Sequence, residues 1–209
     1  MRYSPDRLAC QPSQVAAADD PELISRSRLE SISDGVIAVA LTILVLSVDA
    51  PTTAPGESLW DAIDQGTIFA LLLFVISFAI IARFWVVHHA ALRALPDQIP
   101  NKLVVANFGF LLMVCLVPFA TTLYARNDSD MTALIVYALA FALMSILLST
   151  IRTGGNLRSR PISLFVPAVF LLAIPVGLIV GPNWATLTWM VLVIVPDRRI
   201  NALLDRRAG

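Results

Sequence analysis

The chain has 209 residues, of which 57% are hydrophobic and only 14% are charged, and its fifteen Lys/Arg balance fifteen Asp/Glu. Average soluble domains carry about 25% charged residues, and a mean hydropathy of +0.78 leaves too little polar cover for a soluble surface of this size. A soluble globular protein is therefore nearly excluded, whereas a bilayer solvates apolar side chains directly. Six spans of about 20 residues fit this length as one membrane domain.

The N-terminal segment, residues 1–30, is polar and lacks the apolar core of a cleaved signal peptide, so we expect a cytoplasmic tail. Apolar stretches follow at short intervals, and each predicts a transmembrane helix. They run from residue 32 or 36 to 48, and over 67–87, 103–124, 131–151, 162–180 and 184–195. The expected fold class is all-α, a polytopic membrane protein with six transmembrane helices over residues 31–196 and a cytoplasmic tail over 197–209. The sixth stretch is short for a span.

The basic residues are distributed unevenly between the two sides of the predicted bundle. With six spans, fourteen of the fifteen fall on one side: Arg2, Arg7, Arg26, Arg28, Arg83, Arg93, Lys102, Arg152, Arg158, Arg160, Arg198, Arg199, Arg206 and Arg207. The opposite loops hold Arg126 together with five acidic residues: Glu57, Asp61, Asp64, Asp128 and Asp130. The positive-inside rule therefore predicts that both termini are cytoplasmic.

The first predicted helix opens on a polar segment in which Ser33 or Asp34 is suited to cap the helix. Gly35 gives no capping advantage and costs about 1 kcal/mol relative to Ala in a helix interior. In membranes a small residue of this kind indicates a close contact between helices.

One face of the same helix carries a narrow stripe. At about 100° per residue, the stripe contains Gly35, Val39, Thr42, Leu46 and Asp49, with Ile43 beside it. In a monomeric bundle this would be an ordinary packing face. Around a symmetry axis it would line a narrow, mostly hydrophobic pore with one ring of hydroxyls, and the spacing alone leaves both interpretations open.

The motif Arg28-xxx-Ile32-Ser33-Asp34-Gly35-Val36 resembles the Arg-xxx-Phe-Ser-Asp-Gly-Val signature of the lysosomal potassium channel family, transmembrane protein 175, in its bacterial branch. A second patch, Trp85-Val86-Val87-His88-His89, is similar to that family's Trp-xx-His-His segment, and Asn107 and Pro118-Phe119 also fit its pattern. The resemblance implies a homotetramer of six-helix subunits whose first helices line a central cation pathway. It assigns a structural network to Arg28, Ser33, Asp34, Gly35, Trp85, His88, His89 and Asn107.

By the same resemblance, Val39, Ile43 and Leu46 match the hydrophobic constriction, and Thr42 matches the hydroxyl layer associated with potassium preference. Ile32 replaces the usual Phe, a change that would loosen the packing of the signature against neighbouring helices. Val39 is smaller than the usual Ile or Leu, so a wider or less selective constriction is expected. The implied function is a potassium-preferring cation channel in the bacterial inner membrane, with no cofactor beyond permeant K⁺. Its expected partners are its own copies, membrane lipid and potassium ions, with no nucleic acid.

Other readings of the sequence remain open. A proton-leak channel of the same fold is one alternative. A small secondary transporter is another, although transporters usually place ionisable residues near the midplane, and the centres of the six stretches carry none. An intramembrane enzyme would need a nucleophile turn or a His-Glu-x-x-His motif, and neither is present in the sequence.

Two finer expectations concern individual side chains. Adjacent residues point about 100° apart on a helix, so His88 and His89 are not expected to chelate a metal. We hypothesise that Arg28, Asp34 and one of these histidines form a cytoplasmic network that braces the first helix; the alternative places them at the headgroup boundary. Aromatic anchors at the outer interface are expected at Trp60, Trp184 and Trp189.

Overall fold

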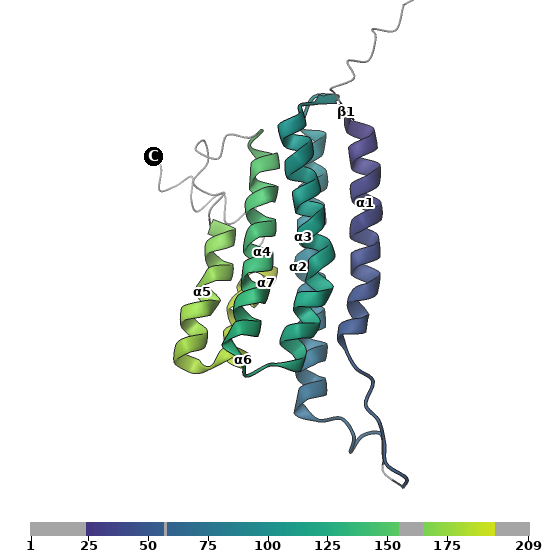
Figure 1. Cartoon of the computed structure of the whole chain (residues 1–209), viewed down its shortest axis with the longest axis vertical. Coiled ribbons are helices and arrows are strands. Elements are labelled where there is room, and N and C mark those ends of the chain that lie inside the picture. Colours follow the sequence, from purple (N-terminus) through teal and green to yellow (C-terminus); the bar gives the residue numbers. More distant parts are fainter. Residues whose placement is uncertain (1–23, 57, 155–164, 195–209) are drawn as a thin grey trace, which may run out of the picture.

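The computed structural model describes residues 24–56, 58–154 and 165–194, with side chains up to residue 190. Four long helices run in alternating directions: α1 (Arg26–Ile43), α2 (Gln65–Arg93), α3 (Asn101–Arg126) and α4 (Met131–Arg152), as Figure 1 shows. A 3₁₀ turn, η1 (Leu44–Ser47), extends α1. They are followed by α5 (Phe165–Val180), α6 (Pro182–Ala185) and α7 (Leu187–Ile194).

The hydropathy of these helices agrees with a membrane protein. Four segments are long and apolar enough to cross a bilayer: Arg26–Ser47, Gln65–Arg93, Asn101–Arg126 and Met131–Arg152. The fifth helix, α5, is apolar but shorter. The sixth predicted span, over residues 184–195, is divided at Thr186 into α6 and α7, so the described residues do not form six long helices. The predicted tails lie largely outside the described residues, and α1 begins at Arg26, before the predicted boundary at residue 31.

The helices are arranged so that α1 lies at one edge of the bundle. It packs against α2 and α3, whereas α4 lies on the other side of α3 and is followed by α5 (Figure 1). The buried face of α1 and η1 follows a helical period and consists of Leu29, Ser33, Ile37, Ala40, Leu44 and Ser47. The opposite face of α1 has no neighbour within the described part of the subunit.

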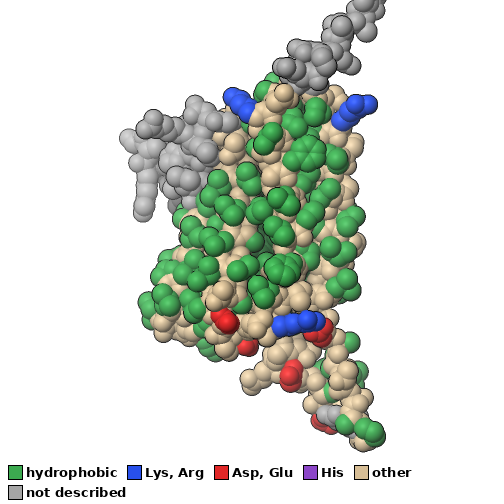
Figure 2. All heavy atoms as spheres, viewed as in Figure 1, with side chains coloured by type: hydrophobic (Ala, Val, Ile, Leu, Met, Phe, Trp, Pro, Cys, Tyr) green, Lys and Arg blue, Asp and Glu red, His purple; other side chains and the backbone are tan. Residues whose placement is uncertain are grey.

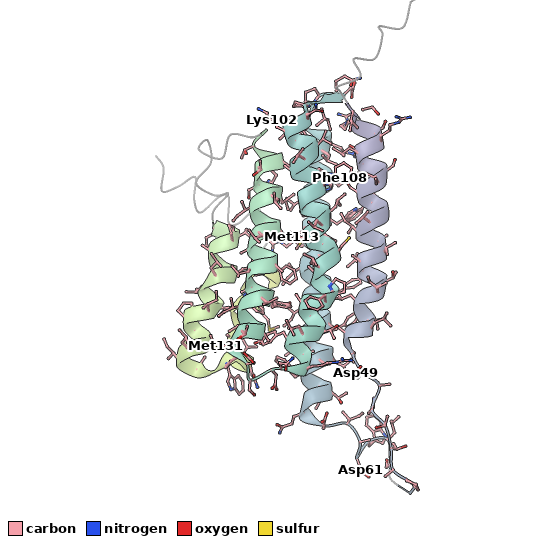
Figure 3. The ribbon with its side chains drawn as sticks, viewed as in Figure 1. Asp49, Asp61, Lys102, Phe108, Met113 and Met131 are labelled. Carbon is pink, nitrogen blue, oxygen red and sulfur yellow. The ribbon has the colours of Figure 1, made fainter. Side chains whose placement is uncertain are left out.

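The two ends of the bundle differ in charge. The end that we call the basic end carries Arg26, Arg93, Lys102 and Arg152, which lie at or next to the ends of the four long helices. The acidic end carries Asp49, Asp61, Asp64, Asp128 and Asp130, together with Arg126. Figure 2 shows an apolar belt between these ends, and Figure 3 places Lys102 and Asp49 at opposite ends. The described residues thus have the charge asymmetry that the sequence predicted.

An aromatic cluster fills the core between α4, α5 and α7. Trp189 is completely buried and stacks on Tyr137 with ring centroids 4.7 Å apart, and Phe141 stacks on Phe170 at 5.2 Å. The prediction that Trp189 is an interfacial anchor is therefore wrong, because α7 turns back into the bundle after α6. Trp60 and Trp184 are exposed, at 83% and 66%.

A short clasp fixes the start of α1. Strand β1 (Ile24–Ser25) pairs antiparallel with β2 (Gln98–Ile99) in the connection between α2 and α3. Arg26 donates hydrogen bonds to the carbonyl oxygens of Arg93 and Leu95 and forms an ion pair with Asp97 at 2.9 Å. Since the last carbonyls of a helix lack partners within it, Arg26 satisfies groups at the C-terminal end of α2.

Candidate functional site

The candidate site is the exposed face of α1 and η1. Its large side chains are uncovered: Val39 is 58% exposed, Ile43 41% and Leu46 73%. Gly35 and Thr42 are exposed on the same helix. A Cβ added at Gly35 would meet no atom within 4 Å, so the close helix contact expected there is not found within the described subunit.

Thr42 presents an oxygen rather than a hydrogen to the outside. Its hydroxyl donates to the carbonyl oxygen of Val39 at 2.7 Å, one turn back in the same helix. A hydroxyl has one hydrogen and two lone pairs. Because that hydrogen is used within the helix, the exposed oxygen is left as an acceptor, which is the role needed to face a cation or the hydrogens of water.

The predicted stripe does not continue to Asp49. The helix tightens into the 3₁₀ turn η1 at Leu44, and Val48 is extended, with φ −106° and ψ 112°. Asp49 therefore leaves the helix, and its carboxylate accepts two hydrogen bonds from the Arg126 guanidinium at 3.0 and 3.1 Å. The prediction that Asp49 continues the stripe is wrong, because the helix ends at Ser47 and the chain turns toward the end of α3.

Behind the exposed face, a buried chain of hydrogen bonds ties α1 to α2 and α3. The Ser33 hydroxyl donates to the Leu29 carbonyl at 2.7 Å, and the Asn107 amide donates to Ser33 Oγ at 3.0 Å. His88 Nε2 lies 2.6 Å from Asn107 Oδ1. Ser33, Asn107 and His88 are each at most 1% exposed.

The direction of this chain is fixed at its carbonyl end. Because a carbonyl oxygen can only accept, the Ser33 hydroxyl donates its single hydrogen to the Leu29 carbonyl. The Ser33 oxygen must then accept from the NH₂ group of Asn107. This orients Asn107 Oδ1 toward His88, and Nε2 of His88 must then carry the hydrogen. The ring of His88 is also stacked on Phe110, with centroids 4.8 Å apart.

A second connection lies at the surface. Trp85 Nε1 donates to Asp34 Oδ1 at 2.8 Å, and the Trp85 ring stacks on His89 with centroids 5.9 Å apart. Adjacent histidines thus have different partners: His88 reaches α3 and His89 stays beside Trp85. The described residues contain no group of three or more His, Cys, Asp or Glu side chains placed to hold a metal ion.

The position of Arg28 differs from the hypothesis of a bracing network. Arg28 is exposed, and no hydrogen bond or ion pair joins it to Asp34 or to either histidine within the described residues. The arginine that braces α1 is Arg26, two residues earlier, through α2 and Asp97. Ser33 and Asn107 complete the network, and their partnership is not visible from sequence spacing, because 74 residues separate them.

Comparisons with known proteins bear on this arrangement. Residues 28–118, which run from the start of α1 into α3, match the family described as the endosomal/lysosomal potassium channel TMEM175. Over 137 residues the chain is 31% identical to a potassium channel of Streptomyces collinus, covering 61% of this chain and 65% of the relative. It is 33% identical over 138 residues to a potassium channel of Chamaesiphon minutus, covering 60% and 64%.

A solved structure is similar across a larger part of the chain. The crystal structure of a lysosomal potassium-selective channel TMEM175 homolog from Chamaesiphon minutus superposes with a TM-score of 0.65 at 28% identity, covering 81% of this chain and 94% of that one. The chain is thus similar to TMEM175 channels in sequence over residues 28–118 and in fold over most of its length. The sequence matches span less than two thirds of the length of these two potassium channels. The segment that matches the TMEM175 family contains the exposed stripe of α1 and all of the buried network, so the resemblance seen in the sequence is confirmed.

Proposed function

We propose that this chain is a potassium-preferring cation channel, in which α1 from each of four identical subunits lines a central pore. Val39, Ile43 and Leu46 would form the hydrophobic constriction, and Thr42 a ring of hydroxyl oxygens. The single observation that carries the proposal is the exposed α1 face in a chain whose relatives are named potassium channels.

The composition of this face supports a pore over a lipid contact. Large exposed apolar residues on α2 and α3, such as Val75 and Leu112 at 58% each, are typical of a surface that lipid covers. The α1 face differs because Gly35 and Thr42 interrupt it with a small residue and an acceptor oxygen. Apolar side chains at a narrow point disfavour water, and a hydroxyl ring there offers partial replacement of an ion's hydration.

The proposed assembly and topology follow from the same features. If four subunits surround an axis, the exposed α1 face of each subunit would pack against the α1 faces of its neighbours. This arrangement would account for the apolar residues on both faces of a helix at the edge of the bundle. We place the basic end in the cytoplasm by the positive-inside rule, with both termini on that side. The corresponding location is the bacterial inner membrane, with six crossings that include α5 and the α6–α7 region.

A liposome flux assay tests the proposal. The full chain is reconstituted with a potassium gradient, and K⁺, Na⁺ and H⁺ flux are measured for the wild type, Thr42→Ala and Leu46→Ala. We expect K⁺ flux in the wild type, a lower K⁺/Na⁺ preference in Thr42→Ala and a higher flux in Leu46→Ala, because the smaller side chain widens the constriction. Leu178→Ala is the matched control, since Leu178 is 72% exposed, close to Leu46 at 73%, but lies on α5.

Two results would reject the proposal. A folded wild-type protein that conducts no cation under any gradient is not a channel, and a folded monomer in detergent and bilayer gives the α1 face no axis to line. Proton flux without K⁺ flux would favour the proton-leak alternative. If Leu46→Ala and Leu178→Ala change the flux equally, the constriction does not lie at η1.

A further inference from the structure

The 3₁₀ turn η1 has a different geometry from the helix that it extends. It covers Leu44–Ser47, and the N–H of Val48 closes it by donating to the Val45 carbonyl at 3.1 Å. A 3₁₀ helix turns about 120° and rises about 2.0 Å per residue, compared with about 100° and about 1.5 Å in an α-helix. The side chains of η1 therefore point in directions that a continued α-helix would not give them.

One consequence concerns the hydroxyl of Ser47. Ser47 is only 3% exposed, and its Oγ has no hydrogen-bond partner among the described residues. Earlier in α1 the Ser33 hydroxyl donates to the carbonyl four residues back, that of Leu29, as helical serines commonly do. In a continued α-helix Ser47 would donate to the Ile43 carbonyl in the same way. Because a buried polar group without a partner is costly, the α form would gain a bond that the 3₁₀ form lacks.

A second consequence concerns the direction of Leu46. Side chains at i and i+3 eclipse in a 3₁₀ turn, so Leu46 points in the same direction as Ile43. In a continued α-helix Leu46 would turn by about 60° relative to Ile43, toward the direction shared by Val39 and Thr42. Leu46 is 73% exposed, so its own subunit does not block this movement. The geometry of η1 thus decides whether Leu46 lies beside Val39 and Thr42 on the stripe.

The packing of η1 is compatible with both forms. Leu44 is completely buried and would turn by only about 20°. Ser47 points in the direction of Leu44 in the 3₁₀ form and close to that of Ala40, which is also buried, in the α form. Conversion shortens the turn by about 2 Å. The ion pair of Asp49 with Arg126, whose side chains are both exposed, resists this only weakly.

We propose that η1 converts between a 3₁₀ and an α form, and that the conversion moves Leu46 away from or onto the stripe beside Val39 and Thr42. The structure has the 3₁₀ form, and the hydrogen bond from Ser47 to the Ile43 carbonyl stabilises the α form. The effect on conduction rests on the proposed channel function, since a pore along α1 is narrower when Leu46 joins the stripe. The conversion itself takes place within one subunit and is measured without any flux.

The test is methyl NMR of the full chain in nanodiscs, with the methyl groups of Leu, Ile and Thr labelled. The ratio of the Leu46–Thr42 cross-peak to the Leu46–Ile43 cross-peak is higher in the α form. Ser47→Ala removes the hydroxyl that favours this form, so the population of the α form relative to the 3₁₀ form should decrease about tenfold. Val45→Ala replaces an exposed β-branched residue by a better helix former and should increase it about threefold.

Ser145→Ala is the matched control. Ser145 is also 3% exposed, but it lies on α4 and its hydroxyl already donates to the Ala142 carbonyl at 2.8 Å. This variant should leave the cross-peak ratio unchanged. A ratio that responds neither to Ser47→Ala nor to Val45→Ala overturns the proposal, as does an equal response to Ser47→Ala and Ser145→Ala.

The liposome assay then relates the conversion to conduction. Ser47→Ala should raise K⁺ flux and Val45→Ala should lower it, and neither change should alter flux in a Leu46→Ala background. A cross-peak ratio that changes as expected in a chain that conducts no cation supports the conversion and rejects the channel, so the two failures are distinguishable. A ratio that changes without any change in the flux of a conducting chain overturns the role of Leu46.

Discussion

Asn107 donates a hydrogen bond to Ser33 across 3.0 Å, and both side chains are completely buried where α3 meets α1. The same amide contacts His88 on α2, so one side chain joins three helices. In a bundle whose α1 packs on one face only, this junction is a specific polar contact among mostly apolar ones. It sets the rotation of α1, and hence which residues face outward.

Replacing Asn107 is expected to destabilise the subunit. Asn107→Ala leaves Ser33 and His88 without their partner, and each buried polar group left unsatisfied costs roughly 1–3 kcal/mol. Denaturant or thermal unfolding in detergent should therefore show a free energy of unfolding that is lower by at least this amount. Asn101→Ala, at the exposed start of α3, is the control and should have little effect. Equal stability of the two variants would contradict a structural role for the network.

The Trp85–Asp34 contact predicts a difference between two substitutions. Asp34→Asn keeps an acceptor oxygen for Trp85 Nε1–H, whereas Asp34→Ala removes it. Because Trp85 is 40% exposed, water compensates in part, and we expect Asp34→Ala to cost about 1 kcal/mol and Asp34→Asn less. Unfolding curves measure the stability, and the tryptophan emission maximum reports the contact. If both variants behave alike, the hydrogen bond contributes nothing.

Two glycines in helices should respond in opposite ways to alanine. Gly35→Ala meets open space and should stabilise a separated subunit by about 1 kcal/mol through helix propensity. A Cβ at Gly177 would lie 2.5 Å from Leu134 Cδ2, whose side chain is fully buried, so overpacking should cost about 1–3 kcal/mol. Thermal unfolding in a dissociating detergent tests both. A stabilised Gly177→Ala variant would show that the packing of α4 on α5 is looser than described.

The N-cap of α2 gives a pH dependence. The Asp64 carboxylate accepts hydrogen bonds from the backbone N–H and from the hydroxyl of Thr67. Both bonds lower the pKa of the Asp64 carboxyl below the usual 3.8, the backbone bond more than the hydroxyl bond. A lowered folded pKa means that the stabilisation is present above pH 3.8 and is lost as pH falls through the folded value. Asp64→Asn retains a capping oxygen without titrating. Unfolding midpoints measured from neutral pH downward should therefore fall less steeply in this variant than in the wild type.

The ion pair of Asp49 predicts a weak effect on conduction. Since Arg126 neutralises the Asp49 carboxylate, the double variant Asp49→Asn/Arg126→Gln, which removes both charges, should change K⁺ flux little at any ionic strength. Arg126→Gln frees the carboxylate and should raise flux at low salt, an effect that screening removes at high salt. A large decrease in flux for the double variant would instead indicate that the Asp49 carboxylate attracts cations to the pore.

The long helices were predictable from the sequence because each apolar run is by itself long enough to indicate a transmembrane helix. The division of the last span into α6 and α7, and the burial of Trp189, depend on how the chain returns to α4 and α5. Hydropathy is the same for a tryptophan in a core and one at an interface, so a sequence window does not separate the two.

For the candidate site, the stripe was predictable as far as the helix is regular. Val39, Thr42 and Leu46 are exposed as expected, while Asp49 departs because the helix ends at Ser47 and Val48 is extended. The motifs around Ser33 and His88 can be recognised in the sequence. Their connection through Asn107 cannot, because it depends on how α3 packs against α1 and α2. Arg26 was overlooked, since its partners are backbone carbonyls that any sequence would supply.

The clasp formed by β1, β2 and Arg26 fixes the start of α1, so a tilt of this helix would pivot about its basic end. Together with the contacts of Ser33 and Asp34, it anchors the basic end through hydrogen bonds to α2 and α3. The other end is held by the packing of Leu44 and Ser47 and by the exposed ion pair of Asp49 with Arg126. Over the roughly 33 Å of 22 helical residues, a tilt of about 5° moves the far end by about 3 Å. Side chains near Leu46 would therefore travel farthest for a given tilt, and those near Gly35 the least.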